Sequence, residues 1–516
     1  MREDPHRRPQ QAGDQDAILA AGGTKRMNAR IDLLCLFPNN RPRAYGTLGH
    51  DVAAITPPLQ AALLAAYVRG AGFSVAVLDA DAEDLSNEQT VERVVSARPR
   101  LVCVSTDALN TGDVTKMAAA TDTTLALKAR LPQTPVALEG VVPSAFPERV
   151  LAETGADFVV RGEPFLTLVL LLGELRQERP RPARPIPGLW IGEGGSIVVG
   201  EPPALAPSLD GLPMAAWDLL PMRLYRAHHW HCFDRLDRRR PYGSIYTNLG
   251  CPYECTFCNV NALYGGPTFR TRSAESVLQE IDLLVAAHGV RNLRIVDNVF
   301  TIRRDLVGDL CERLASRGHD LNIWAYARVE TVDLPLLRTM RRAGVTWLAY
   351  GIEAASAKVR QGAAKPSSQR AIERAIEATR SAGINIVGNF MFGLPDDTME
   401  SMAATLRMAK EHTFEHANFY AAMAYPGTAL HEEARRAGIP LPGSWSGYGQ
   451  YSEDALPMGS AHVSAADVLR FRDEAFLEYF TYPPYLALLE AKFGPQAVAF
   501  TREVVGHKIR RRLLEA

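Results

Sequence analysis

The stretch Gly243–Gly266, GSIYTNLGCPYECTFCNVNALYGG, places three thiols, Cys251, Cys255 and Cys258, within eight residues. An apolar, β-rich run precedes them and ends at Gly250. We therefore expect a strand that stops at a glycine and continues as a cysteine loop, in which all three sulfurs can point at one centre. Thiolates are soft ligands, suited to zinc or to iron–sulfur clusters.

Two kinds of metal centre are compatible with this triplet. Structural zinc normally takes four protein ligands, so a zinc site would need Cys232 or one of His228, His229 and His231 as the fourth. An iron–sulfur cluster held by three cysteines instead leaves one metal with an open position, where a substrate or cofactor can bind.

The composition bounds the class of protein. The chain has 516 residues, 47% hydrophobic and 22% charged, with a formal net charge of −1; this is typical of a soluble protein of several domains, with no overall attraction to nucleic acid or to an anionic membrane. No apolar run is long enough to span a bilayer, and residues 1–29 lack a secretory signal and are expected to form a disordered tail. The seven scattered cysteines predict a cytoplasmic protein without a disulfide framework.

Residues 30–176 alternate short apolar strands with helical segments, which predicts an α/β domain with a doubly wound (Rossmann- or flavodoxin-like) parallel sheet. Its ligands would lie at the carboxyl ends of the strands. The expected strands are Ile31–Phe37, Ser74–Leu78, Leu101–Val104, Pro135–Leu138 and Asp157–Val160. The expected helices are Leu59–Arg69, Thr90–Ala97, Lys116–Arg130, Pro147–Glu153 and Phe165–Leu175.

Residues 177–240 read as a linker that contains a small hairpin, since Gly-Glu-Gly-Gly separates two apolar runs. In the cluster His228–His231, satisfied or exposed histidines are expected rather than a metal site, and the position just before the first barrel strand makes the cluster a candidate wall of the active site. Residues 439–516 predict a mainly helical C-terminal extension with a helix at Ala465–Phe480. Its aromatic residues Trp445, Tyr448 and Tyr451 suit either a lid over a substrate or a packed cap.

Residues 241–438 repeat a strand–helix unit six times, which predicts a partial (β/α)6 barrel whose chemistry lies at the carboxyl ends of its strands. Polar residues stand at or near those ends: Asp297, Arg328, Glu353 and Asn389. The expected strands are Gly243–Asn248, Asn292–Val296, Asn322–Tyr326, Trp347–Ile352, Asn385–Met391 and His416–Ala422. The expected helices are Ala274–His288, Arg304–Ser316, Pro335–Ala343, Ser368–Ala382, Met399–His412 and Ala429–Ala437.

The Cys-x3-Cys-x2-Cys spacing, with Phe257 before the last cysteine, resembles the radical S-adenosylmethionine (SAM) superfamily. The stretches IVDNVF, ARVETVD, YGIEAAS, NIVGNFMFGLPDDT and NFYAAMAYPGT resemble its SAM-binding motifs. The resemblance implies that Cys251, Cys255 and Cys258 hold a 4Fe-4S cluster. It also implies a SAM site in which Asp297 receives the amino group, Arg328 holds the carboxylate and Glu353 accepts from the ribose. The SAM site predicted in this way consists of Phe257, Asp297, Arg328, Glu353, Asn389, Gly393 and Ala424.

The stretches PPLQAALLAAYVRGAGFSVAVLDA, LVCVST and VVRGEPFLTL resemble the cobalamin-binding domain that precedes the radical core in one large subgroup. No Asp-x-His-x-x-Gly motif is present, which favours cobalamin bound without a histidine ligand. Glu139 stands where this subgroup has the first glycine of a Gly-Gly loop. The resemblance implies a cobalamin site that consists of Ser105, Thr106, Glu139, Gly140, Gly162 and Glu163. A flavodoxin-like domain used only for packing is the alternative.

The resemblance implies an enzyme that generates a 5′-deoxyadenosyl radical and methylates an unactivated carbon of a small-molecule substrate, with an electron donor of the flavodoxin or ferredoxin type. The alternatives are a radical SAM enzyme that catalyses a rearrangement, cyclisation or dehydrogenation, and, from a different class, a non-catalytic iron–sulfur or zinc protein. A methylthiotransferase is disfavoured because the N-terminal domain has no second cysteine triplet.

Overall fold

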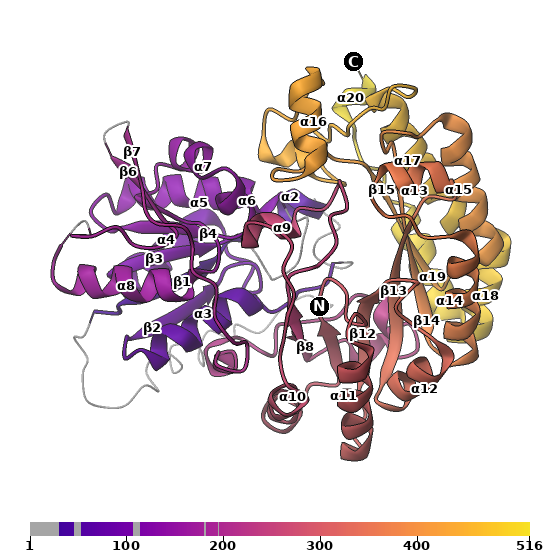
Figure 1. Cartoon of the computed structure of the whole chain (residues 1–516), viewed down its shortest axis with the longest axis horizontal. Coiled ribbons are helices and arrows are strands. Elements are labelled where there is room, and N and C mark those ends of the chain that lie inside the picture. The colour runs from indigo at the N-terminus through magenta and orange to yellow at the C-terminus, as the bar shows by residue number, and fades with distance from the viewer. Residues whose placement is uncertain (1–29, 46–52, 107–113, 180–181, 194–195, 516) are drawn as a thin grey trace, which may run out of the picture.

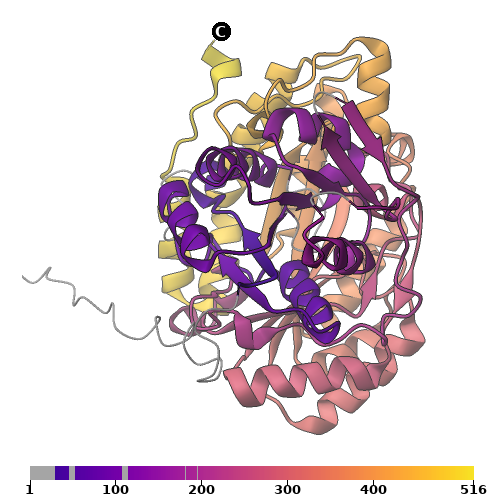
Figure 2. The same cartoon turned by 90° about the vertical axis from the view of Figure 1, so that its left-hand side faces the viewer.

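The computed structural model describes residues 30–45, 53–106, 114–179, 182–193 and 196–515. It contains an α/β domain, a six-stranded barrel and a helical C-terminal region (Figure 1). Figure 2 shows the α/β domain in front of the barrel, against the side that the outer helices leave uncovered. None of the helices described is both long and apolar enough to cross a membrane. The tail predicted at residues 1–29 lies outside the described residues.

The first domain is built on a seven-stranded sheet in the order β2-β1-β3-β4-β5-β6-β7, and its first five strands pair in parallel. Leu33 and Cys35 belong to one core and Leu34 and Leu36 to another, so the sheet is covered on both faces, as the apolar strands predicted. The strands are β1 (Leu33–Phe37), β2 (Val75–Asp79), β3 (Leu101–Ser105), β4 (Val136–Glu139), β5 (Phe158–Val160), β6 (Leu189–Glu193) and β7 (Ser196–Val199). The helices are α2 (Arg41–Tyr45), α3 (Leu59–Gly70), α4 (Asn87–Ala97), α5 (Lys116–Arg130), α6 (Val141–Ala145), α7 (Pro147–Thr154) and α8 (Pro164–Arg176).

The hairpin is not part of a separate linker, which corrects the expected organisation. Its first strand β6 pairs antiparallel with β5, and β7 forms the edge of the sheet. The physical reason is that β5 would otherwise leave the backbone donors and acceptors of its outer edge unpaired, and the hairpin that follows α8 satisfies them.

The second sheet is parallel throughout, in the order β15-β14-β13-β12-β11-β8, and it forms the predicted partial barrel. Its strands are β8 (Tyr242–Ile245), β11 (Asn292–Ile295), β12 (Asn322–Ala327), β13 (Val345–Glu353), β14 (Asn385–Phe392) and β15 (His416–Ala421). Its outer helices are α10 (Ala274–His288), α11 (Arg304–Arg317), α12 (Leu334–Arg342), α14 (Gln369–Ser381) and α15 (Met399–His412). The cysteine loop lies between β9 (Asn248–Leu249) and α9 (Val260–Tyr264), and β9 pairs with β10 (Arg270–Thr271).

The His228–His231 cluster closes the floor of the barrel, so its expected role as an active-site wall is wrong. The Trp230 ring lies 5.2 Å from Trp324, 5.3 Å from Trp347 and 5.4 Å from His416, between centroids. His231 Nε2 lies 3.0 Å from the carbonyl oxygen of Asn322, the first residue of β12. This segment precedes β8 closely in the chain, and it therefore has to lie at the amino ends of the strands, opposite the chemistry.

The open edge of the barrel, at β15, is covered by side chains of the C-terminal region. The Gln450 amide both donates to and accepts from the backbone of Ala421 at 2.9 Å, as a neighbouring strand would. Arg472 donates to the Phe419 carbonyl at 2.9 Å. Helix α16 (Ala429–Ala437) follows β15 with the bounds predicted for the sixth helix of the barrel. The helices of the C-terminal region are α17 (Ala465–Phe480), α18 (Pro483–Phe493), α19 (Pro495–Val505) and α20 (Arg512–Glu515), and α17 has the predicted bounds.

Trp445 and Tyr448 form a packed aromatic cap, which decides between the two alternatives. Both are buried in the core that the first domain shares with them. The Arg149 guanidinium of α7 lies 4.0 Å from the centre of the Trp445 ring. The C-terminal region therefore holds the barrel and the first domain together.

We expect Trp230→Ala to lower the free energy of unfolding by about 3–5 kcal/mol, because it removes a large ring from the centre of the barrel floor. Urea denaturation followed by tryptophan fluorescence measures the change. Trp230→Phe retains a ring against His416 and should cost clearly less. Equal effects of the two substitutions would contradict a role in packing.

Candidate functional site

The cysteine loop begins where the chain turns sharply at Gly250. This residue has φ 85°, and a Cβ there would overlap the Thr268 carbonyl, so only glycine fits. Thr256, inside the loop, donates from its amide to the Ala363 carbonyl at 3.2 Å and accepts from the Leu430 amide at 3.0 Å. Two later loops of the barrel thus fix the middle of the cysteine loop.

The three cysteines are free thiols, with Cys251 buried and Cys255 and Cys258 partly exposed. Burial raises the pKa of Cys258 to about 12, so a bound metal would have to displace its proton. No three His, Cys, Asp or Glu side chains in the described ranges lie close enough to hold a single metal ion. Three thiols with no fourth protein ligand are the donor set that fits a cluster with one open iron.

The fourth ligands considered for a zinc site lie at the other end of the barrel. The Cys232 thiol donates to Asn292 at 3.3 Å, beside the first residues of β11 and β12. Arg328, by contrast, lies directly after the last residue of β12, with Nη1 3.8 Å from Cys255 Sγ. Arg328 lies six residue steps along the strand from Asn322, about 20 Å. Neither Cys232 nor His231 can therefore complete a metal site with the triplet.

Arg328 lies beside the cysteine loop. Its guanidinium is 4.0 Å from the centre of the Tyr253 ring, and its Nε donates to Glu330 at 3.3 Å. This fixed, largely buried cation is suited to a carboxylate. Its contact with SAM stays a prediction.

Asp297 is a buried carboxylate that fixes the start of the cysteine loop. It accepts from the Thr247 amide at 2.7 Å, from the Thr247 hydroxyl, and from the amide and side chain of Asn248 at 3.2 and 2.7 Å. Burial raises the pKa of Asp297 to about 6. All of these bonds run to β9 and the residue before it, so the structure gives Asp297 a positioning role, and its contact with the amino group of SAM stays a prediction.

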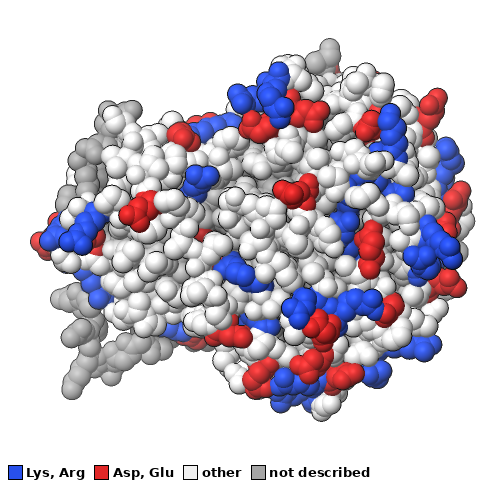
Figure 3. All heavy atoms as spheres, in the orientation of Figure 1, with Lys and Arg blue, Asp and Glu red and all other residues white. Residues whose placement is uncertain are grey.

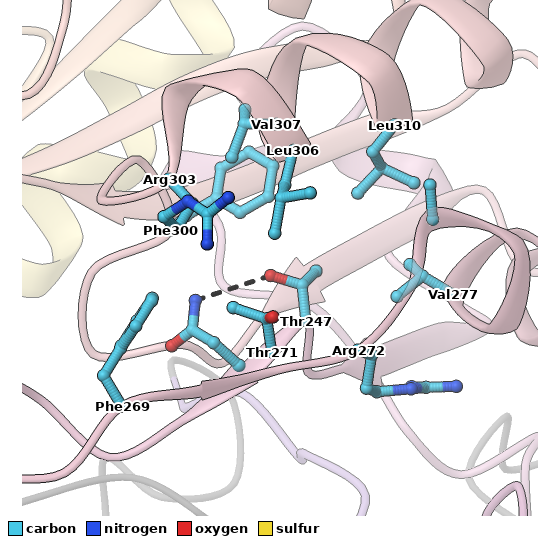
Figure 4. Close-up of a pocket in the computed structure, with 12 residues that line it drawn as sticks. Thr247, Phe269, Thr271, Arg272, Val277, Phe300, Arg303, Leu306, Val307 and Leu310 are labelled. Carbon is cyan, nitrogen blue, oxygen red and sulfur yellow. Dashed lines mark hydrogen bonds between the residues drawn. The ribbon is translucent and has the colours of Figure 1, made fainter. Parts of the chain in front are cut away.

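A crevice lies next to the hydrogen bonds of Asp297. It is lined by Thr247 and Asn248 on one side and by residues of α10 and α11 on the other (Figure 4). Val277, Leu306 and Leu310 make it apolar. None of the three cysteines is among its lining residues, and it is a packing crevice of the outer layer rather than the cofactor site.

Glu353 forms a buried ion pair that sequence reasoning missed. Its carboxylate lies 2.6 Å from Lys365 Nζ, and both residues are at least nine-tenths buried. Glu353 has φ 66°, in the left-handed region, where a residue other than glycine is strained. A Cβ at Gly351 would overlap both charged groups, so this glycine makes room for the pair. The sequence gives little indication of this ion pair, because nothing in QGAAKP marks Lys365 as the partner of a residue twelve positions earlier.

Arg360 stabilises the two chain segments that carry this ion pair. It is fully buried, and it donates to the carbonyls of Ala354 and Ala355 at 2.6 and 2.7 Å and to that of Ser367 at 2.8 Å. One guanidinium thereby joins the segment after Glu353 to the segment after Lys365.

The other predicted SAM residues lie in or after the carboxyl-terminal halves of the barrel strands. Asn389 donates to the Tyr350 carbonyl at 3.1 Å and accepts from Asn418 at 2.9 Å. Gly393 follows β14 with φ 84°, and Ala424 belongs to a small apolar cluster against which Phe257 packs. Phe257 thus connects the cysteine loop to the cluster around Ala424, and the contacts of all four residues with SAM stay predictions.

Four of the predicted cobalamin residues meet at the carboxyl edge of the first sheet. Thr106 donates through its amide and hydroxyl to the Glu139 carbonyl at 3.1 and 2.9 Å, and Ser105 bonds the Glu139 carboxylate. Glu139 is fully buried, so its side chain leaves the surface beside Gly140 clear for a flat ring. With φ 129°, Gly140 has a backbone that suits glycine. This edge fits cobalamin.

Gly162 and Glu163 lie at the interface with the barrel side. A Cβ at Gly162 would lie 2.6 Å from Pro203 Cβ, and Glu163 forms an ion pair with Arg270 of β10 while it accepts from the Ala206 amide at 2.6 Å. Their role in cobalamin binding stays a prediction, whereas the structure shows that Glu163 ties the first domain to the barrel.

The helix after Gly140 and the helix after the cysteine loop both contact the barrel loop that contains Gly427. α6 starts directly after Gly140, and α9 starts just after Cys258. A Cβ on Gly427 would lie 2.7 Å from Ala262 Cβ of α9 and 3.1 Å from Ala145 Cβ of α6. The carboxyl edges of the two sheets are thus brought together by close backbone packing.

We expect Lys365→Met to lower the free energy of unfolding of the cofactor-free protein by about 3–5 kcal/mol, since it leaves Glu353 as a buried charge without its partner. Lys358→Met is the matched control, because the Lys358–Asp396 pair is exposed and should contribute about 0–1 kcal/mol. Urea denaturation gives both values. Equal losses would contradict the importance of the buried pair.

Comparison with known proteins finds a family match for each of the two domains. Residues 245–409 match the radical SAM superfamily and residues 46–172 match the B12 binding domain. An uncharacterised methyltransferase of Pyrococcus horikoshii is 28% identical over 86% of this chain and 90% of its own. The anaerobic magnesium-protoporphyrin IX monomethyl ester cyclase of Rubrivivax gelatinosus is 26% identical over 78% of this chain and 69% of its own.

Among solved structures, the radical SAM methyltransferase TsrM of Kitasatospora setae, with cobalamin and a [4Fe-4S] cluster bound, aligns with a TM-score of 0.65. It covers 93% of this chain and 100% of its own at 18% identity, which establishes the shared fold. The two domain matches, together with the fold and the cysteine loop, show that this chain carries a radical SAM domain preceded by a B12-binding domain.

Proposed function

We propose that this enzyme is a cobalamin-dependent methyltransferase that acts on an unactivated carbon of a small molecule. The contact of α6 and α9 with Gly427 carries the proposal, because it brings the cobalamin edge and the cysteine loop to one interface. A first domain used only for packing would not need its ligand edge there. The methyltransferase relative from Pyrococcus horikoshii also supports it.

The residues of the site have three roles: some hold the cofactors, some position the cysteine loop, and some close the interface around the cofactors. Cys251, Cys255 and Cys258 would hold the cluster, and Arg328 and Glu353 would hold SAM. When bound, the cluster and SAM supply a 5′-deoxyadenosyl radical, and cobalamin supplies the methyl group. Asp297 fixes the loop.

Enclosure comes from the interface between the domains. The Glu163–Arg270 ion pair and the buried Trp445 and Tyr448 hold the first domain on the barrel. A closed interface of this kind would protect a reactive radical from side reactions with water.

A cyclisation or another reaction without methyl transfer is the second candidate, because the relative from Rubrivivax gelatinosus is a cyclase.

We further propose an electron donor of the flavodoxin or ferredoxin type and a cytoplasmic location. On the face seen in Figure 3, Lys and Arg side chains are interspersed with Asp and Glu.

The first test is anaerobic reconstitution with iron, sulfide and cobalamin, followed by reduction with dithionite in the presence of SAM. We expect iron near four and cobalt near one per chain, and both 5′-deoxyadenosine and S-adenosylhomocysteine as products. Cys255→Ala should lose the cluster and 5′-deoxyadenosine while it retains cobalt. Stoichiometric iron without cobalt would contradict methyl transfer and favour the second candidate.

Gly427→Ala tests the interface. Gly427 and Gly438 both have left-handed φ values, of 80° and 66°, but a Cβ at Gly438 meets nothing within 4 Å. Both substitutions carry the backbone strain, about 1–2 kcal/mol, and only Gly427→Ala adds a clash with α9 and α6. We expect Gly427→Ala alone to reduce cobalt retention and S-adenosylhomocysteine formation. Equal retention in both variants would contradict the role of this contact.

A further inference from the structure

Arg294 is a buried cation inside the barrel. It lies on β11 at a position paired with Ser244 of β8 and Trp324 of β12. Its guanidinium is 4.7 Å from the centre of the Trp324 ring, and the residue is 9% exposed. Within the described ranges it makes no ion pair or side-chain hydrogen bond, and its Nε is buried without a partner.

The direction of Arg294 follows from its neighbours. Paired residues of parallel strands point to the same face, and Trp324 contacts Trp230 and the Tyr242 hydroxyl in the barrel's interior. Leu293 and Ile295, the residues on either side, therefore face the outer helices. Arg294 points into the barrel.

Two hydroxyl groups accompany this cation. Ser244 is 1% exposed, and its hydroxyl has no hydrogen-bond partner among the described residues. Tyr326 is on the same face of β12 as Trp324, 5.2 Å away between ring centroids. Tyr326 lies two residues further along β12 than Trp324, the partner of Arg294, which places it between the interior cation and the carboxyl end of the strand.

Space remains beside Tyr326. Tyr326, Asn418 and Tyr420 lie on the concave side of the barrel yet are partly accessible, so side chains do not fill its interior completely. An unpaired guanidinium next to such space is costly for the free protein, because a buried charge without a counter-charge loses its hydration without compensation.

We propose that Arg294, with Ser244 and Tyr326, binds an anionic group of the substrate, a carboxylate or a phosphate. We call these three residues the Arg294 site. The inference rests on the proposed function, since it assumes that a small-molecule substrate enters the barrel. Arg294 supplies charge and two parallel donors, Ser244 supplies a hydroxyl, and the anion is held below the SAM end with the rest of the substrate directed toward the cysteine loop.

The test measures anion binding without turnover. The thermal unfolding midpoint of the holoprotein is recorded with increasing sodium phosphate or sodium acetate, each against sodium chloride at equal ionic strength. We expect a saturable rise of about 2 °C or more with one of the two anions. A response to phosphate alone identifies a phosphate-type substrate, and a response to acetate alone identifies a carboxylate.

Arg294→Met removes the charge at similar length. We expect this variant to lose the anion response and, without anion, to unfold at the same temperature as the unmodified protein or higher, since an uncompensated charge is gone. The matched control is Arg303→Met, because Arg303 is exposed and pairs with Asp305, and it should keep the response. A lower midpoint for Arg294→Met without anion, together with an unchanged response to anions, would show a structural arginine and overturn the proposal.

Ser244→Ala keeps the charge and provides a second readout if Arg294→Met does not fold. It should weaken anion binding by about tenfold, the contribution of one hydrogen bond to a charged group. An unweakened response would remove Ser244 from the site.

SAM carries a carboxylate of its own, so SAM is added without reductant in a further arm. If SAM alone produces the Arg294-dependent rise and afterwards abolishes the acetate response, the anion belongs to the cofactor and the proposal fails. The two proposals fail separately. An Arg294-dependent anion response without methyl transfer refutes only the proposed function, whereas SAM cleavage without any anion response refutes only the Arg294 site.

Discussion

The carboxylate of Asp297 determines where the barrel becomes a cofactor site. It accepts from two successive residues, Thr247 and Asn248, just before the chain turns at Gly250 into the cysteine loop. A buried carboxylate is tolerated only when donors surround it, so its position and theirs depend on each other. Loss of this contact would free the base of the loop, whereas the middle of the loop is held independently by Thr256.

Two other pairs of buried charged residues neutralise each other. Glu353 has Lys365, and Arg272 has Glu280 at 2.7 Å, so each of these charges has a partner within the protein. Arg294 is different among the described residues, because its nearest defined contact is the face of Trp324. A protein retains such a group at a cost to stability when function needs it, which is why Arg294 rather than one of the paired charges points to a ligand.

The two domains are joined by several unrelated contacts. Gly427 allows close backbone approach, Glu163 and Arg270 form an ion pair, and the aromatic cap extends from the C-terminal region onto α5 and α7. None of these alone is a large interface. Together they fix the carboxyl edges of both sheets in one place, and the chemistry of the enzyme depends on that distance.

The sequence by itself determined most of the strands and helices and the class of both sheets, and it predicts the cysteine ligands, because strand and helix patterns and the Cys-x3-Cys-x2-Cys spacing are local properties of the chain. Tertiary structure decided everything that depends on contacts between distant segments. It moved the histidine cluster from an expected active-site wall to the barrel floor, added the hairpin to the first sheet, and gave Glu353 its partner Lys365. It also left Arg294 facing inward without a counter-charge, which no local pattern shows, since the charge balance of a side chain is set by strands that are adjacent in space and far apart in sequence.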